Sequence, residues 1–299
     1  MAGQTARALL PRSGIAEAIR RRIAEEVRDM FNDRARGEQP VARRADGLFG
    51  PSSAIWRVHG DVTSMMIGGI AALLLQMLHP AVLAGVWDHS RFRDDRLGRL
   101  RRTARFIALT TYGGREEAVA AIAEVRAIHG RVRGVLPDGR AYAASDPRLL
   151  AWVHVTEAQC FLDGWRRYGE PAMPPAEQDR YFAEMAVIGR ALGADPVPLD
   201  RAQAAALIAA MRPELACDAR AREVARLLLG TPAQRLSAEP FQRLLQAAAV
   251  DLLPAWARAM HGFADPPRAL HGFADPPRAL PFVRSAATGL ARTLRWAFR

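Results

Sequence analysis

The sequence predicts an all-α protein, and three observations support this fold class. Its long apolar segments repeat with the period of a helix. No part of the chain shows several alternating apolar and polar runs separated by tight turns, as antiparallel strands require. Half of the 299 residues are hydrophobic and 24% are charged, a balance typical of folded globular proteins. We therefore expect a helical body large enough to bury a sizeable core.

The first elements are an amphipathic helix and a long uncharged segment. Residues 13–34 predict an arginine-rich helix, followed by a polar, unstructured stretch to about Pro51. The segment 62–87 contains no charged residue and is long enough to cross a membrane. However, His79-Pro80 interrupts it. We interpret it as a buried core helix that walls an apolar chamber, with a membrane span as the alternative.

The next two helices carry the candidate site. The helix expected at about 96–112 places on one stripe Leu97, Leu100, Ala104 and Ile107. The helix expected at about 116–132 places on one stripe Ile122, Val125, His129 and Val132. A loop rich in glycine and proline leads to Asp146-Pro147. Proline and glycine then separate five more expected helices, at about 147–167, 175–194, 199–211, 219–229 and 237–261.

The C-terminal part contains a duplication and a basic helix. The unit HGFADPPRAL occurs twice in succession from His261, as expected of a tolerant surface loop, and we assign it no function. Residues 281–299 predict an amphipathic helix that either docks on the body, which we favour, or makes weak contact with a membrane surface. We divide the chain into an N-terminal extension (1–50), a catalytic domain (51–260) and a C-terminal segment (261–299).

Composition excludes several classes of function. The sequence contains no lysine, so all 42 cationic residues are arginine, and both Schiff-base chemistry and a Walker-type phosphate loop are excluded. The net charge of +11 is compatible with nucleic acid or anionic membrane as a partner. We favour a solvated arginine-rich surface and expect no nucleic-acid binding, because no recognition motif accompanies the charge. With only Cys160 and Cys217, and no signal-peptide apolar core, we expect a cytoplasmic protein.

Among the seven histidines, His129 is the most informative. No HExxH, no Glu-x-x-His pair and no GxSxG elbow occurs. His129 replaces an aliphatic residue on an apolar stripe, and a single imidazole in an apolar interior is how helical proteins bind haem iron. Arg126 and Arg133 lie three before and four after it, where they could neutralise two propionates. By spacing alone, a core histidine bonded to a carbonyl explains His129 better.

Arg99 and Thr103 form a second candidate pair, four residues apart beside the other stripe. A guanidinium and a hydroxyl next to an apolar chamber could stabilise bound dioxygen or a polarised intermediate. Taken alone, a solvated helix edge is the better explanation, since seven arginines lie within 91–105. His79, His89 and His154 are weaker candidates. We expect His79 to cap the carbonyls of the preceding helix, and Glu157 to hold the ring of His154.

Several ordered phrases resemble one known family. The run GGIAALLLQMLHPAVLAGVWDHSRFRDDRLGRLRRTARFIALTTYGG (68–114) resembles the start of the MpaB/rubber-oxygenase catalytic domain. The stretch VRAIHGRVRG (125–134) resembles the proximal-histidine helix of that family. The phrases AYAASDPRLLAWVHVT (141–156) and LLPAWARAM (252–260) are similar to bacterial members in order and spacing. The resemblance covers about 50–260 and continues more weakly to Trp296.

This resemblance implies a haem-b iron oxygenase with a globin-like core. Members of the family include latex-clearing enzymes, which split polyisoprene with dioxygen, and a fungal membrane-bound enzyme that cleaves a farnesyl-type side chain. The resemblance places the proximal iron ligand on His129, the following arginine on Arg133, and the distal Arg-x-x-x-Thr pair on Arg99 and Thr103. The chain departs from the latex-clearing pattern at Arg102, where a distal lysine is expected, because a protonated arginine is a poor iron ligand.

We therefore expect an oxygenase that uses haem b and dioxygen on a hydrophobic small molecule, with an isoprenoid as one candidate. His129 is the expected metal ligand, and Arg126 and Arg133 are expected to bind the cofactor. The catalytic residues are expected to be Arg99 and Thr103, and the catalytic base is left unassigned. The alternative is a non-catalytic helical protein that carries haem or lipid, or that binds a membrane surface peripherally through 281–299.

Overall fold

A computed structural model describes residues 37–230, 239–263 and 283–297, together with Glu17, Arg21 and Glu25. These three single residues are helical, and the rest of the helix expected over 13–34 lies outside the described residues. Most of the duplicated HGFADPPRAL segment also lies outside them, because the description stops at Phe263 and resumes at Val283.

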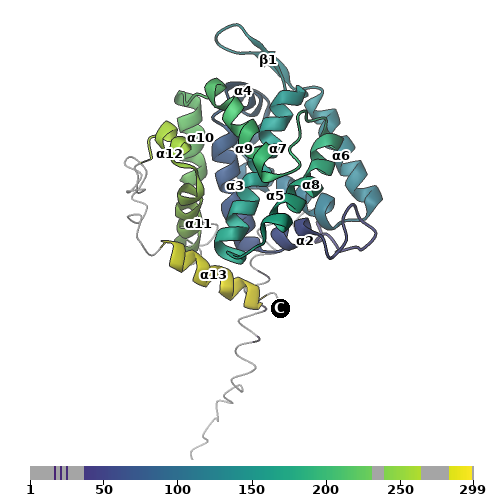
Figure 1. Cartoon of the computed structure of the whole chain (residues 1–299). Helices are drawn as coiled ribbons and strands as arrows, with labels where there is room; N and C mark the ends of the chain where they lie inside the picture. The colour runs from purple at the N-terminus through teal and green to yellow at the C-terminus, as the bar shows by residue number, and fades with distance from the viewer. Residues whose placement is uncertain are drawn as a thin grey trace, which may run out of the picture.

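The described chain is mostly helical, which confirms the all-α prediction (Figure 1). One short antiparallel hairpin, β1 (Arg133–Val135) and β2 (Ala141–Ala143), pairs Gly134 with Tyr142 in the segment expected to be a loop. The helices are α2 (Ala54–His59), α3 (Val62–Gln76), α4 (Pro80–His89), α5 (Arg96–Tyr112), α6 (Arg115–His129), α7 (Pro147–Gly164), α8 (Pro175–Leu192), α9 (Arg201–Met211), α10 (Ala219–Leu229), α11 (Glu239–Leu252), α12 (Ala255–His261) and α13 (Val283–Ala297). Three single-turn helices are η2 (Arg91–Arg93), η3 (Trp165–Gly169) and η4 (Arg212–Glu214).

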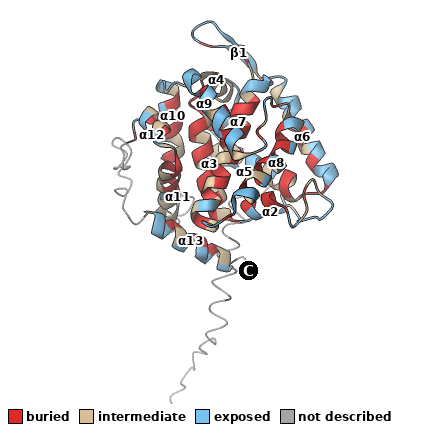
Figure 2. Ribbon diagram, viewed as in Figure 1, coloured by how far each residue is buried: buried red, intermediate tan, exposed pale blue. Residues whose placement is uncertain are grey.

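Helix α3 lies at the centre of the body and packs most extensively against α7 (Figures 1 and 2). The two helices approach closely at two glycines. A Cβ atom at Gly68 would lie 2.7 Å from the Cys160 carbonyl oxygen, and one at Gly164 would lie 2.7 Å from the Ser64 carbonyl oxygen. Because both neighbours are backbone atoms, only glycine permits this helix crossing. The part of the uncharged segment that forms α3 is thus a core helix, as predicted.

The expected break at His79-Pro80 separates α3 from α4. Pro80 is the first residue of α4, and the Ala81 N–H donates to His79 Nδ1 at 3.3 Å. His79 therefore caps the start of α4, and the expectation that it caps carbonyls of the preceding helix is wrong. Among the described residues, no single helix is long and apolar enough to span a membrane. Helices α3 and α4 pass that test only together, and they are bent by 105°.

Helices α5 and α6 pack against each other, and α6 also contacts α8. Helix α5 has the expected bounds, but Leu100 on its predicted apolar stripe is 45% exposed. Helix α6 ends at His129, because Gly130 follows and the chain then enters the hairpin. The expected extension of this helix to Val132 is therefore wrong, and Val132 does not continue the helical stripe.

The C-terminal helices cover the other side of α3. The single helix expected at 237–261 is two helices, α11 and α12, because Pro254 interrupts it. Helix α13 packs on α3 and α11 through the buried residues Ala287, Ala291 and Leu294. Its Arg295 donates to the Tyr168 carbonyl at 2.9 Å and lies 3.3 Å from Asp61 Oδ2. The structure thus shows the docked arrangement that we favoured for this segment.

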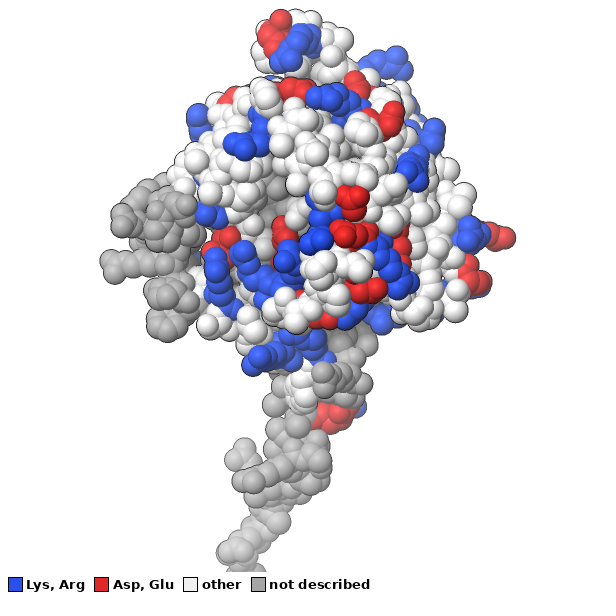
Figure 3. Space-filling model, in the orientation of Figure 1, with Lys and Arg blue, Asp and Glu red and all other residues white. Residues whose placement is uncertain are grey.

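On the face drawn in Figure 3, arginines are interspersed with acidic side chains, most densely over the lower half. Among the described residues, opposite charges form ion pairs, such as Arg201 with Asp179 at 2.7 Å and Arg284 with Asp251 at 2.8 Å. This mixture fits a solvated, arginine-rich surface rather than a continuous basic patch on this face.

Candidate active site

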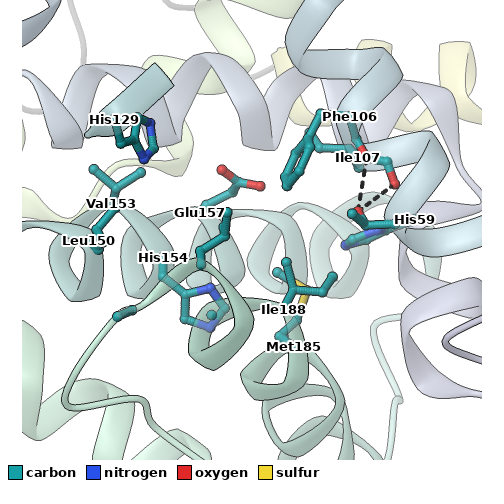
Figure 4. Close-up of a pocket in the computed structure, with 14 residues that line it drawn as sticks. His59, Phe106, Ile107, His129, Leu150, Val153, His154, Glu157, Met185 and Ile188 are labelled. Atoms are coloured by element: carbon teal, nitrogen blue, oxygen red, sulfur yellow. Dashed lines mark hydrogen bonds between the residues drawn. The ribbon is translucent and has the colours of Figure 1, made fainter. Parts of the chain in front are cut away.

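A small cavity of about 60 Å³ lies between the α5–α6 pair and helices α7 and α8 (Figure 4). Its wall is mainly apolar, and five side chains with polar atoms also line it: His59, Thr110, His129, His154 and Glu157. No residue of α3 contributes to this wall, so our expectation that the uncharged segment walls the chamber does not hold for this cavity. Helix α3 instead packs against α7, which carries several of the lining residues.

His129 reaches the cavity from the C-terminal end of α6 (Figure 4). Its side chain is half-buried, and Nδ1 is buried without a hydrogen-bond partner among the described residues. Burial lowers its pKa, because the charged imidazolium is poorly solvated there. Burial thus favours the neutral imidazole, which is the form that binds a metal ion, and no described residue makes the carbonyl bond that would have explained a core histidine.

His154 lies on α7 at the opposite side of the same cavity (Figure 4). Its ring packs against Gly189 of α8, where a Cβ atom would lie 2.8 Å from Nε2. Burial lowers the pKa of His154 to about 4, so the ring is neutral at pH 7. The expectation that Glu157 holds this ring is wrong, because no hydrogen bond joins these two described side chains.

Glu157, one turn further along α7, is the acidic residue of the cavity. In Figure 4 its carboxyl group points to the middle of the cavity, with His129 and Phe106 on either side. Burial raises its pKa to about 7, since an apolar wall disfavours the carboxylate. The sequence analysis missed Glu157 as a site residue. The only feature of the sequence that pointed to Glu157 is that it shares a face of α7 with His154.

His59 of α2 was also missed, and it closes the end of the cavity near α5 and α8. Its Nδ1 lies 2.8 Å from Thr111 Oγ1, and its Nε2 lies 3.1 Å from the Tyr181 hydroxyl. Burial lowers the pKa of His59 to about 3. Both ring nitrogens are therefore occupied within the protein, which makes His59 a fixed, neutral part of the wall.

The two arginines expected beside His129 lie outside the cavity wall. Arg126 is exposed and donates to the Ala191 carbonyl at 2.9 Å. Arg133 is exposed on β1 and donates to the Gly130 carbonyl at 3.2 Å. Helical spacing does not apply between His129 and Arg133, because α6 ends at His129. Neither guanidinium is paired with a carboxylate of a described residue, so both are free to bind one.

The structure does not bring Arg99 and Thr103 into the cavity. Arg99 is half-buried, donates to Ser90 Oγ at 2.6 Å and lies over the Phe92 ring at 5.8 Å. Burial lowers its pKa. Thr103 is exposed, one turn before the lining residues Phe106 and Ile107 of the same helix. The pair thus lies along the α5 face that leads to the cavity.

The donor chemistry of the site fits a cofactor held by one histidine. Within the described ranges, no group of three or more His, Cys, Asp or Glu side chains could hold a metal ion. An iron at His129 would therefore need its remaining ligands from a porphyrin. Ligand pockets usually enclose about 300–1,000 Å³. At about 60 Å³, this cavity is smaller than a porphyrin requires as the helices stand.

Comparison with known proteins gives one finding. Residues 56–292 match the family described as the catalytic domain of ER-bound oxygenase mpaB/B' and rubber oxygenase. The matched range includes every residue of the cavity and extends into α13. Comparison with curated proteins and with solved structures finds no match.

Proposed function

Since this chain belongs to the family of mpaB-type and rubber-oxygenase catalytic domains, we propose that it is a haem-b-dependent oxygenase. Its second substrate beside dioxygen would be a hydrophobic small molecule, with an isoprenoid as one candidate. The observation that carries the proposal is His129, whose buried Nδ1 has no partner among the described residues beside an apolar cavity. The position of this histidine within the matched range supports the same assignment.

In this proposal His129 holds the iron, and the helices around it form the globin-like pocket that the resemblance implies. Arg126 and Arg133 would bind the propionates, because both are exposed near the end of α6 and contact only backbone carbonyls. A bound haem would supply the iron at which dioxygen is activated. The protein would supply position and exclude water, which the apolar residues of α5, α7 and α8 can do.

Arg99 and Thr103 are proposed as the residues that stabilise charge beside bound dioxygen. Arg99 is suited to this role because its guanidinium is half-buried without a carboxylate partner among the described residues. A propionate clamp is the other role for Arg99.

Oxygen uptake tests the proposed activity directly. The purified chain, reconstituted with haem b, is incubated with short prenyl alkenes and isotopically labelled dioxygen, and the products are analysed by mass spectrometry. We expect substrate-dependent oxygen uptake and labelled products. Full haem occupancy without uptake for any prenyl or other apolar alkene would instead support the non-catalytic carrier.

A further inference from the structure

Glu157 differs from the other buried acidic side chains of the protein. Asp61, Glu184 and Asp251 have side chains that are at most 16% exposed, and described residues satisfy all three with backbone N–H groups, hydroxyls or arginines. Glu157 forms no hydrogen bond and no ion pair with any described residue. Its carboxyl group faces the cavity instead (Figure 4).

The Glu157 carboxyl group is open to the cavity, where a bound molecule that supplies a hydrogen-bond partner would be stabilised by it. Two other polar groups near the α5 side of the cavity already have partners within the protein. Both ring nitrogens of His59 are occupied, and the Thr110 hydroxyl donates to the Phe106 carbonyl at 2.9 Å. No described side chain hydrogen-bonds Glu157, although His129 and His154 face the same cavity, and a molecule bound in the cavity could serve as its partner.

We propose that Glu157 is a specificity-determining residue, which hydrogen-bonds a hydroxyl or carbonyl group of the substrate. The substrate class is then an oxygenated, otherwise apolar molecule, such as a prenyl alcohol or prenyl ketone, rather than a pure hydrocarbon. This inference rests on the proposed function in one respect, because it takes the cavity that His129 lines as the place where the substrate lies beside the cofactor.

The chemistry of Glu157 matches both kinds of polar group. Because burial raises its pKa to about 7, protonated and ionised forms coexist at neutral pH. The protonated form donates to a carbonyl, and either form accepts from a hydroxyl. A hydrocarbon offers neither, so it would leave the carboxyl group unpaired. Sites that hydrogen-bond a substrate group discriminate strongly against analogues without it.

The test measures binding rather than turnover, so that it is independent of the oxygenase proposal. A five-carbon prenyl alcohol, its methyl ether and the matched prenyl hydrocarbon are titrated into the full chain by ligand-observed NMR. Short ligands suit the small cavity. For the wild type we expect the alcohol to bind about tenfold more tightly than the hydrocarbon or better. Glu157→Gln should keep most of this preference, and Glu157→Leu should abolish it.

Asp163→Asn is the matched control, since Asp163 lies on the same helix and is hydrogen-bonded to Gln159 outside the cavity wall. It should keep the preference for the alcohol. Equal affinities of the wild type for all three ligands would overturn the inference, even if the leucine variant does not fold. An alcohol preference that survives Glu157→Leu would also overturn it. Failure of haem loading or oxygen uptake would contradict the proposed function alone.

Discussion

The ring of His154 lies against Gly189 so closely that a Cβ atom at position 189 would be 2.8 Å from Nε2. This contact joins α7 to α8 across the cavity wall and leaves the imidazole no room to turn toward α8. The position of the His154 ring therefore depends on the glycine at position 189 of α8, because any larger residue there would clash with the ring.

We predict that Gly189→Ala pushes the His154 ring into the cavity. The added methyl group should lower the free energy of unfolding by about 1–3 kcal/mol, as overpacking does, and should weaken ligand binding. Chemical denaturation and ligand titration measure the two effects. Gly69→Ala is the control, because its new Cβ would have only an ordinary contact at 3.7 Å with Phe161. Equal stability of the two variants would show that the His154 ring moves freely.

The docking of α13 depends on Arg295. Asp61 is only 3% exposed, and the Arg295 guanidinium is the cation nearest to its Oδ2 among the described ion pairs. Arg295→Ala leaves a buried carboxylate without its cation, so we expect a loss of about 1–3 kcal/mol in unfolding free energy. Arg292→Ala, an exposed arginine on the same helix, should change it by less than about 0.5 kcal/mol. Urea denaturation compares them, and indistinguishable midpoints would contradict the role of Arg295.

The histidines of the cavity predict a loss of stability in acid. The pKa of His154 falls from 6.5 to about 4 on folding, so between these values the unfolded chain binds a proton that the folded chain excludes. Stability due to this group is present above pH 6.5 and is lost as the pH falls toward 4, by on the order of 3 kcal/mol. Glu157 acts in the opposite sense, because its raised pKa costs stability as the pH rises from 4.5 to about 7.

His154→Gln should therefore lose less stability than the wild type between pH 6.5 and pH 4. The measurement is the unfolding free energy at several pH values in this range. Parallel curves for the wild type and His154→Gln would mean that His154 is not excluded from protonation in the folded state.

If Arg99 and Thr103 stabilise charge beside bound dioxygen, replacing them should reduce turnover without reducing haem binding. Arg99→Ala and Thr103→Ala should each retain haem and reduce oxygen uptake by about a hundredfold, as loss of a charge-stabilising donor does. Their combined effect should be less than additive, because both act on the same charge. Haem content and oxygen uptake are measured for both single variants and for the double variant. If only Arg99→Ala loses haem, Arg99 binds a propionate, and unchanged uptake in both would refute the assignment.

Much of the fold could be predicted because local signals mark the helix ends. Helix α10 has the predicted bounds, and α7 and α8 begin where their prolines predict. The predicted helix ends were wrong where a single glycine or proline ends a helix that the apolar periodicity would continue. Gly130 ends α6 before Val132, and Pro254 divides the last long helix in two. The short helix α2 carried too little periodicity to be recognised.

The cavity was harder to predict than the helices. His129 was found because it stands on an apolar stripe, but the same argument could not reveal which other elements face it. His59 belongs to a helix 70 residues earlier, and His154 and Glu157 belong to α7, most of whose surface is buried. Periodicity cannot tell which buried face of α7 meets α3 and which meets the cavity. Only the packing of α7 on α3 settles this question.

The most direct test of the account is the haem content of His129→Ala and His154→Ala, two variants that each remove one imidazole from the same cavity. The measurements are the Soret absorption and the haem-to-chain ratio after reconstitution, with circular dichroism as the control for folding. We predict about one haem per chain in the wild type and in His154→Ala, and none in His129→Ala, with helical content preserved. Full haem occupancy and an unchanged Soret band in His129→Ala would contradict the assignment of His129 as the iron ligand.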